Sequence, residues 1–167
     1  MSSTKFNPTR ALKVIPSDNC NVPYPTVLAQ GVTVGEATDL LITSGGPFIT
    51  NSIYNVNTGD VVYNITSSKA ATIIEVIDND KLLLNADIML VGEEFIIYQE
   101  GPTTGLGNQG CLLYLSGESV IDNLHITTIG MDDIFIGKVT TGLFVIQTKK
   151  VWETGTTFGA GEIHALW

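Results

Sequence analysis

The segment from residue 111 to residue 167 constrains the fold most, because it is a nearly unbroken series of short apolar stretches with the character of β-strands. The stretches read CLLYLSG, VIDNLHITTIG, DIFIG, GLFVIQTKKVW and EIHALW, and turn residues rich in glycine separate them. A chain end that stays apolar to its last tryptophan is typical of a strand held in a sheet. We therefore expect this end of the chain to lie in a core or an interface.

Residues 39–99 show a second series of strands with strong turn chemistry. A glycine pair follows DLLIT, NTGD precedes VVYNIT, and AATIIEVI meets KLLLNA across Asp78, Asn79 and Asp80, which predicts a hairpin. Five or six strands in about sixty residues suit a small barrel or a rolled meander. No stretch of useful length has the period of a helix.

These patterns predict an all-β chain with several segments. Residues 1–38 hold four of the six prolines, which predicts an extended arm with one strand near residues 11–15. Residues 39–99 are expected to form a small β-barrel module, residues 100–110 a glycine-rich linker, and residues 111–167 an antiparallel β-sandwich or barrel unit. We expect the strand of the arm to complete the C-terminal sheet, so that the module is an insertion. The arm then either wraps its own domain or crosses to a neighbouring subunit.

Composition favours a subunit that buries surface against neighbours. The chain of 167 residues is 44% hydrophobic and only 15% charged. The alternative explanation is an ordinary monomer with a large core, since folded surfaces are largely apolar in any case. Its net charge of −9 would repel a phosphate backbone, which argues against nucleic acid as a partner. The N-terminus lacks the apolar core of a signal peptide, and no apolar run approaches the length of a spanning helix, so we expect neither export nor membrane insertion.

The residues that could carry chemistry are few. His125 and His164 are the only histidines, and both stand within expected strands between apolar neighbours, so we expect them to point outward or into an interface with structural roles. Cys20 and Cys111 lack metal-ligand spacing and are expected to be buried thiols of a reducing compartment, although a single disulfide stays open.

Three other motifs are better explained by turn propensity than by function. The segment at residues 78–80 resembles the start of a calcium loop but lacks the glycine and glutamate that the loop requires. Asp132 and Asp133 follow a glycine, as turn residues do. The loop GPTTGLGNQG lacks the lysine and the helix of a phosphate-binding loop. We therefore assign no catalytic, cofactor-binding or metal-ligating residue and expect no cofactor and no enzymatic activity.

Several segments resemble one family of viral particle proteins. These are Pro16-Ser17-Asp18 after a short strand, GCLLYLSG at residues 110–117, GLFVIQTKKVWETGTT at residues 142–157, and EIHALW at residues 162–167. Together they are similar to the head-spike base proteins of tailed bacteriophages and gene transfer agents. The chain departs from that pattern in carrying residues 39–99, a segment similar to small β-modules of several phage virion proteins.

The resemblance implies a non-enzymatic structural protein of a virion that assembles in the host cytoplasm. It implies a homo-oligomer, a trimer or a pentamer, that contacts the major capsid protein or other virion proteins and holds a fibre or spike protein. A head-spike base is the main hypothesis, and a capsid cement protein or a neck or tail component is the alternative. A third hypothesis is a carbohydrate-binding adhesion module that uses Tyr54, Tyr63 and Tyr98, although strand tyrosines are more often core residues.

Overall fold

The computed structural model describes residues 8–48, 55–101, 110–116 and 122–167, and within these ranges the chain is all-β. Its strands form two antiparallel sheets of six strands each, and the prediction of an all-β chain is confirmed. The strands are β1 (Ala11–Lys13), β2 (Val27–Val32), β3 (Leu40–Ile42), β4 (Val61–Asn64), β5 (Lys69–Val76), β6 (Lys81–Leu84), β7 (Glu94–Tyr98), β8 (Cys111–Leu115), β9 (Asp122–Thr128), β10 (Asp133–Val139), β11 (Gly142–Val151) and β12 (Ile163–Leu166).

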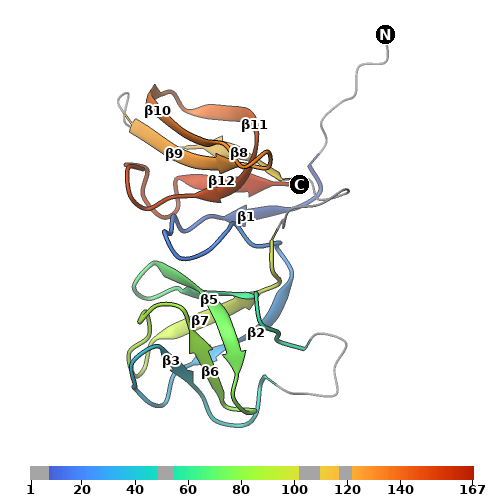
Figure 1. Ribbon diagram of the computed structural model, residues 1–167, viewed down its shortest axis with the longest axis vertical. Helices are drawn as coiled ribbons and strands as arrows, with labels where there is room; N and C mark the ends of the chain where they lie inside the picture. Colours follow the sequence, from blue (N-terminus) through green and yellow to red (C-terminus); the bar gives the residue numbers. More distant parts are fainter. Residues whose placement is uncertain (1–7, 49–54, 102–109, 117–121) are drawn as a thin grey trace.

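The C-terminal sheet has the order β1-β12-β8-β11-β9-β10. Its first strand comes from the N-terminal arm, because β1 pairs antiparallel with β12 and places Leu12 opposite Ala165. The prediction that an N-terminal strand completes this sheet is confirmed. Figure 1 shows the consequence, since the first and last described strands lie side by side at the boundary between the two units.

The module sheet has the order β2-β7-β4-β5-β6-β3. An isolated bridge between Gly35 and Ile42, in which the backbone N–H of Val34 donates to the carbonyl of Ile42 at 2.9 Å, brings its two edge strands together. A Cβ at position 35 would lie 3.1 Å from the Ile42 side chain, so glycine permits this close approach. The sheet therefore curls so that its two ends approach each other, which agrees with the small barrel or rolled meander that the number of strands predicted.

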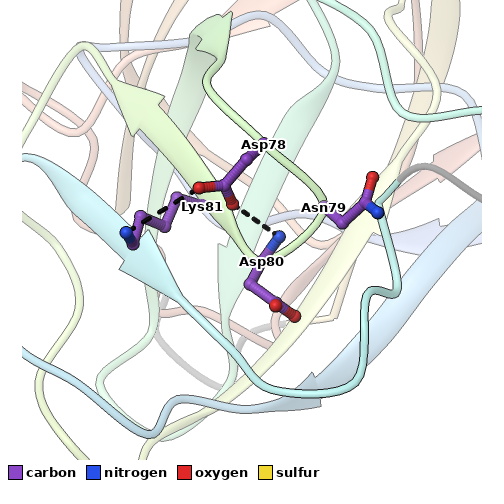
Figure 2. A pocket seen from close by; sticks show the side chains of 4 residues that line it. All are labelled: Asp78, Asn79, Asp80 and Lys81. Carbon is purple, nitrogen blue, oxygen red and sulfur yellow. Dashed lines mark hydrogen bonds and ion pairs between the residues drawn. The ribbon is translucent and has the colours of Figure 1, made fainter.

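The hairpin of β5 and β6 turns at residues 78–80, as predicted, and Figure 2 shows how its side chains hold it. The Asp78 carboxylate accepts a hydrogen bond from the backbone N–H of Asp80 at 2.8 Å and lies 3.7 Å from the Lys81 ammonium. The Asp80 carboxylate accepts one from the N–H of Gly46 at 2.6 Å. These carboxylates satisfy backbone donors of the turn and of the loop beside it.

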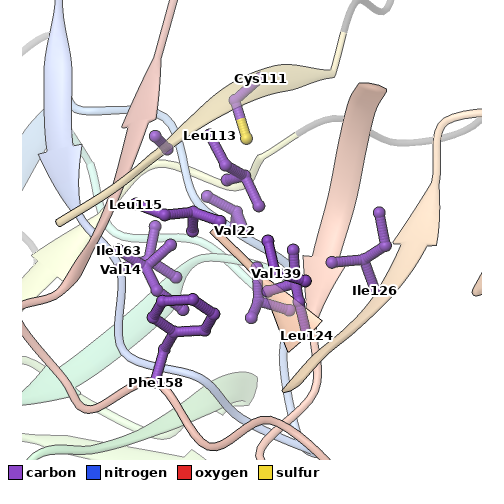
Figure 3. Close-up of a cluster of buried hydrophobic side chains, with 12 residues drawn as sticks. Val14, Val22, Cys111, Leu113, Leu115, Leu124, Ile126, Val139, Phe158 and Ile163 are labelled. Carbon is purple, nitrogen blue, oxygen red and sulfur yellow. The ribbon is translucent and has the colours of Figure 1, made fainter. Parts of the chain in front are cut away.

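Each unit has its own core. The C-terminal core takes alternate residues of its strands, and Figure 3 shows Leu113 and Leu115 of β8 among side chains from other segments. Its buried members are Val14, Val22, Cys111, Leu113, Leu115, Leu124, Ile126, Val139, Val151, Phe158, Ile163 and Ala165. The module core is centred on Leu41, Phe48, Ile73, Leu82 and Phe95, all at most 1% exposed.

A third cluster of buried side chains joins the two units, and its members are Leu12, Ile15, Cys20, Val61, Tyr63 and Ala70. Hydrogen bonds support it, because the Ser17 hydroxyl donates to the carbonyl of Ala70 at 2.8 Å and the Asn85 amide donates to that of Asn19 at 2.6 Å. The described part of the arm thus lies on its own chain, between the C-terminal unit and the module.

The expectation of a single strand in residues 1–38 was wrong. The arm holds a second strand, β2, which pairs with β7 and belongs to the module, so the module sheet begins at Val27 and not at residue 39. The physical reason is that β2 is an edge strand with mostly exposed or half-buried side chains. Such a strand is held by one row of backbone hydrogen bonds and shows no clear apolar alternation.

Candidate docking surface

Alternation along β8 places apolar side chains on both faces of the C-terminal sheet. Cys111, Leu113 and Leu115 enter the core, whereas Leu112 and Tyr114 point to the opposite side. Residues that are directly paired across antiparallel strands share a face. The register therefore extends this side across β12 and β11, and we call it the outer face: Leu112, Tyr114, Leu143, Val145, His164 and Leu166.

The outer face is more apolar than a solvated sheet face should be. An antiparallel sheet with one side in water normally alternates apolar and polar residues. Here Val145 is 72% exposed, Leu143 48% and Tyr114 46%. Contiguous exposed apolar side chains of this kind are typical of interaction sites.

His164 lies in the middle of a row that crosses three strands of this face and β1. It is paired with Lys13 on one side and with Tyr114 on the other, and its ring centroid is 6.5 Å from that of Tyr114. Its Nδ1 atom is buried and makes no hydrogen bond within the described part of the chain. The histidine therefore contributes to the outer face.

Charge is divided unequally between the two units. Residues 27–99, which contain the module, carry nine acidic residues and two lysines, a net charge of −7. The rest of the chain carries eight acidic residues and six basic ones, a net charge of −2. The outer face thus belongs to the nearly neutral unit, while the module holds most of the negative charge.

Two strands, β8 and β11, separate the strand of His125 from that of His164 in the sheet, and the contacts of His125 are structural. Its ring stacks on Trp152 with centroids 5.2 Å apart and meets Phe135 edge-on at 6.1 Å. Its Nδ1 lies 2.8 Å from the carbonyl of Thr154, and the Lys150 ammonium lies 3.5 Å from the centroid of the Trp152 ring. These contacts hold the turn after β11 against β9.

Asp132 and Asp133, which were also named from the sequence, take part in the turn between β9 and β10. Asp133 accepts a hydrogen bond from the Thr127 hydroxyl at 2.5 Å, and the Asp132 N–H donates to the Thr128 hydroxyl at 3.2 Å. The side chains of residues 78–81 line a hollow at the hairpin turn between β5 and β6, which Figure 2 shows. Within the described ranges, no three histidine, cysteine or acidic side chains gather as metal ligands would.

Both cysteines are free and buried. Desolvation raises the pKa of Cys20 to about 11 and that of Cys111 to about 12. A buried thiol with a raised pKa stays protonated at neutral pH and is a poor nucleophile. The disulfide that the sequence left open is not formed.

The tyrosines proposed for a sugar platform do not form one in the described structure. Tyr63 is 2% exposed, and its ring packs edge-on against that of Tyr98 with centroids 5.2 Å apart. Desolvation raises the pKa of Tyr63 well above its ordinary value. Tyr54 lies outside the described residues, as do residues 102–109 of the glycine-rich loop.

Comparisons of the chain with protein-family models, with curated proteins and with solved structures found no match. In the part of the chain that the structure describes, no helix has the length and apolar character to cross a membrane. The outer face was not predicted from the sequence, although the segments CLLYL and GLFVI contain the pattern that indicates it. Both are apolar at consecutive positions, which indicates a strand with two apolar faces.

Proposed function

We propose that this chain is a non-enzymatic structural subunit of a tailed-phage virion, the oligomeric base of a head spike or fibre that attaches to the capsid. The observation that carries the proposal is the outer face, an exposed apolar sheet surface on a chain with few charges. Such a subunit acts by binding through buried area and shape, with no turnover.

The folded positions of the resembling segments support this proposal. Four of these segments provide strands that are neighbours in one sheet. They are the strand before Pro16, which is β1, and the segments GCLLYLSG (β8), GLFVIQTKKVW (β11) and EIHALW (β12). The head-spike resemblance therefore falls on one physical unit. The module that the chain adds forms a sheet of its own and is available to hold the next component.

The proposal is tested by determining whether the chain is a component of purified particles. Virions purified from a host that produces the chain are analysed by mass spectrometry. In a second experiment, the purified protein is mixed with particles from a variant whose gene for this chain has an early stop codon, and rebinding is measured. We expect the chain in the first particles and its co-sedimentation with the second. Absence from purified particles together with failure to rebind would overturn the proposal.

Stoichiometry separates the spike base from the alternatives. A base at the vertices is present in far fewer copies than the major capsid protein, whereas a cement protein covers the capsid faces. A neck or tail component would stay with tails when heads and tails are separated. The copy number and the fraction in which the chain is found therefore decide among these positions.

A further inference from the structure

We infer that the outer face is covered by the same face of another copy of this chain, so that the C-terminal sheets meet around a symmetry axis. This inference rests on the proposed function and names the partner of its docking surface. Side chains that line the symmetry axis of a closed homo-oligomer meet their equivalents on neighbouring copies, so a patch at the axis has to be compatible with itself. The outer face meets this requirement because its members are four aliphatic side chains, a tyrosine and a histidine.

Charge favours a second copy on this face and disfavours it on the module. Two copies that met through their modules would bring two net charges of −7 together, whereas the rest of each chain carries only −2. Repulsion between exposed charges is screened beyond about 8 Å at physiological ionic strength. Contact through the outer face can therefore keep the acidic modules apart while apolar surface is buried.

The edges of the outer face have the mixed polarity of an interface rim. Lys13 of β1 stands beside His164 on one side, and Glu162 precedes β12 with its carboxylate accepting a hydrogen bond from the N–H of Gly159 at 2.6 Å. An apolar centre with a charged rim is the usual anatomy of a protein interface. The most exposed member of the centre is Val145, at 72%, so it should lie closest to the neighbouring copy.

The first experiment measures mass in solution by light scattering after size exclusion. Leu143→Asp places a charge on the outer face, and Ile74→Asp is its matched control on β5 of the module, because both parent side chains are 48% exposed. We expect the wild type and the control to have at least twice the monomer mass of 17.9 kDa, and the Leu143 variant to fall to the monomer. Association should persist in 0.5 M salt, since screening weakens repulsion and leaves apolar burial intact.

The second experiment maps the contact by oxidation. Val145→Cys introduces an exposed thiol, and Ile74→Cys is the control, while the native Cys20 and Cys111 are buried and should not react. Mild oxidation should link copies of the Val145 variant and leave the control unlinked at the same concentration. Far-UV circular dichroism of every variant verifies that the sheets are retained.

A monomeric wild type, or a Leu143 variant that keeps its mass while the Ile74 variant dissociates, would overturn the inference. A monomeric wild type that rebinds to particles, with a Leu143→Asp variant that does not, would show that the outer face docks on the shell and not on a second copy. Conversely, an oligomer that is absent from particles would contradict the proposed function and leave this inference intact. The two proposals can therefore fail separately.

Discussion

The Asp18 carboxylate accepts two hydrogen bonds from Thr154, one from its backbone N–H at 3.0 Å and one from its hydroxyl. The two residues are separated by 136 positions, so the pair ties the arm to the turn after β11. The Lys150 ammonium strengthens the connection by donating to the carbonyl of Asp18 at 2.8 Å. Both residues belong to segments on which the phage resemblance rests, Pro16-Ser17-Asp18 and the Thr154–Thr157 turn.

This pair should make stability depend on pH. Desolvation raises the pKa of Asp18, but the hydrogen bonds from Thr154 and Glu153 and the charge of Lys150 outweigh it, so the pKa lies below its ordinary value of 3.8. A lowered pKa stabilises the fold above the unfolded value and loses that effect as the pH falls through the folded value. Asp18→Asn should therefore cost a few tenths to about 1 kcal/mol at pH 7, because the site is exposed.

Urea unfolding at pH 7 and at pH 3 tests this prediction. The difference between wild type and Asp18→Asn should shrink at the lower pH, where the native carboxylate begins to protonate. Asp78→Asn is a suitable comparison, since the nearby Lys81 ion pair is local and exposed. A difference that is equal at both pH values would contradict the assignment.

Leu12 should be important for stability despite its place in a strand of three residues. It is 6% exposed and belongs to the cluster between the two units, so Leu12→Ala should lower the free energy of unfolding by about 2–5 kcal/mol. Val91→Ala, at a 57% exposed position, should cost about 0.5 kcal/mol or less. Denaturant titration at one protein concentration measures both, and similar losses would show that the junction contributes little.

Asn64 is the buried polar residue on which one end of the module depends. It is 0% exposed, and its amide donates to the carbonyl of Ile88 and to the Glu93 carboxylate, both at 2.6 Å. Asn64→Ala should cost about 1–3 kcal/mol, because the carbonyl of the buried Ile88 and the backbone N–H of Ser67 lose the partner that Asn64 supplies. Thermal unfolding against the exposed Asn79→Ala control measures the effect, and equal melting temperatures would refute it.

The two thiols should be unreactive in the native protein. Because desolvation raises the pKa of Cys20 to about 11 and that of Cys111 to about 12, both remain protonated at pH 8. A thiol reagent such as DTNB should label neither thiol promptly in buffer and both in denaturant. Rapid labelling of the folded chain would show that the sites open readily or that burial is incomplete.

Local patterns were sufficient for the strand content and for several turns. The turn at Asp78, Asn79 and Asp80 forms because aspartate side chains accept hydrogen bonds from nearby backbone N–H groups, an effect that needs only a few residues. The strand at the end of the chain forms where apolar residues alternate between the core and the outer face, as at Ala165 and Leu166. The prediction that a strand near residues 11–15 completes the C-terminal sheet was correct, whereas its pairing with β12 was seen only in the structure.

The sequence alone determined that this chain is all-β, helix-poor and built around apolar strands, because those properties depend on neighbours along the chain. Only the tertiary structure decided that Val27–Val32 belongs to the module and that Leu143, Tyr114 and His164 form one row. Both outcomes depend on which distant strands pair and in what register, since a shift of one residue would turn every side chain to the other face.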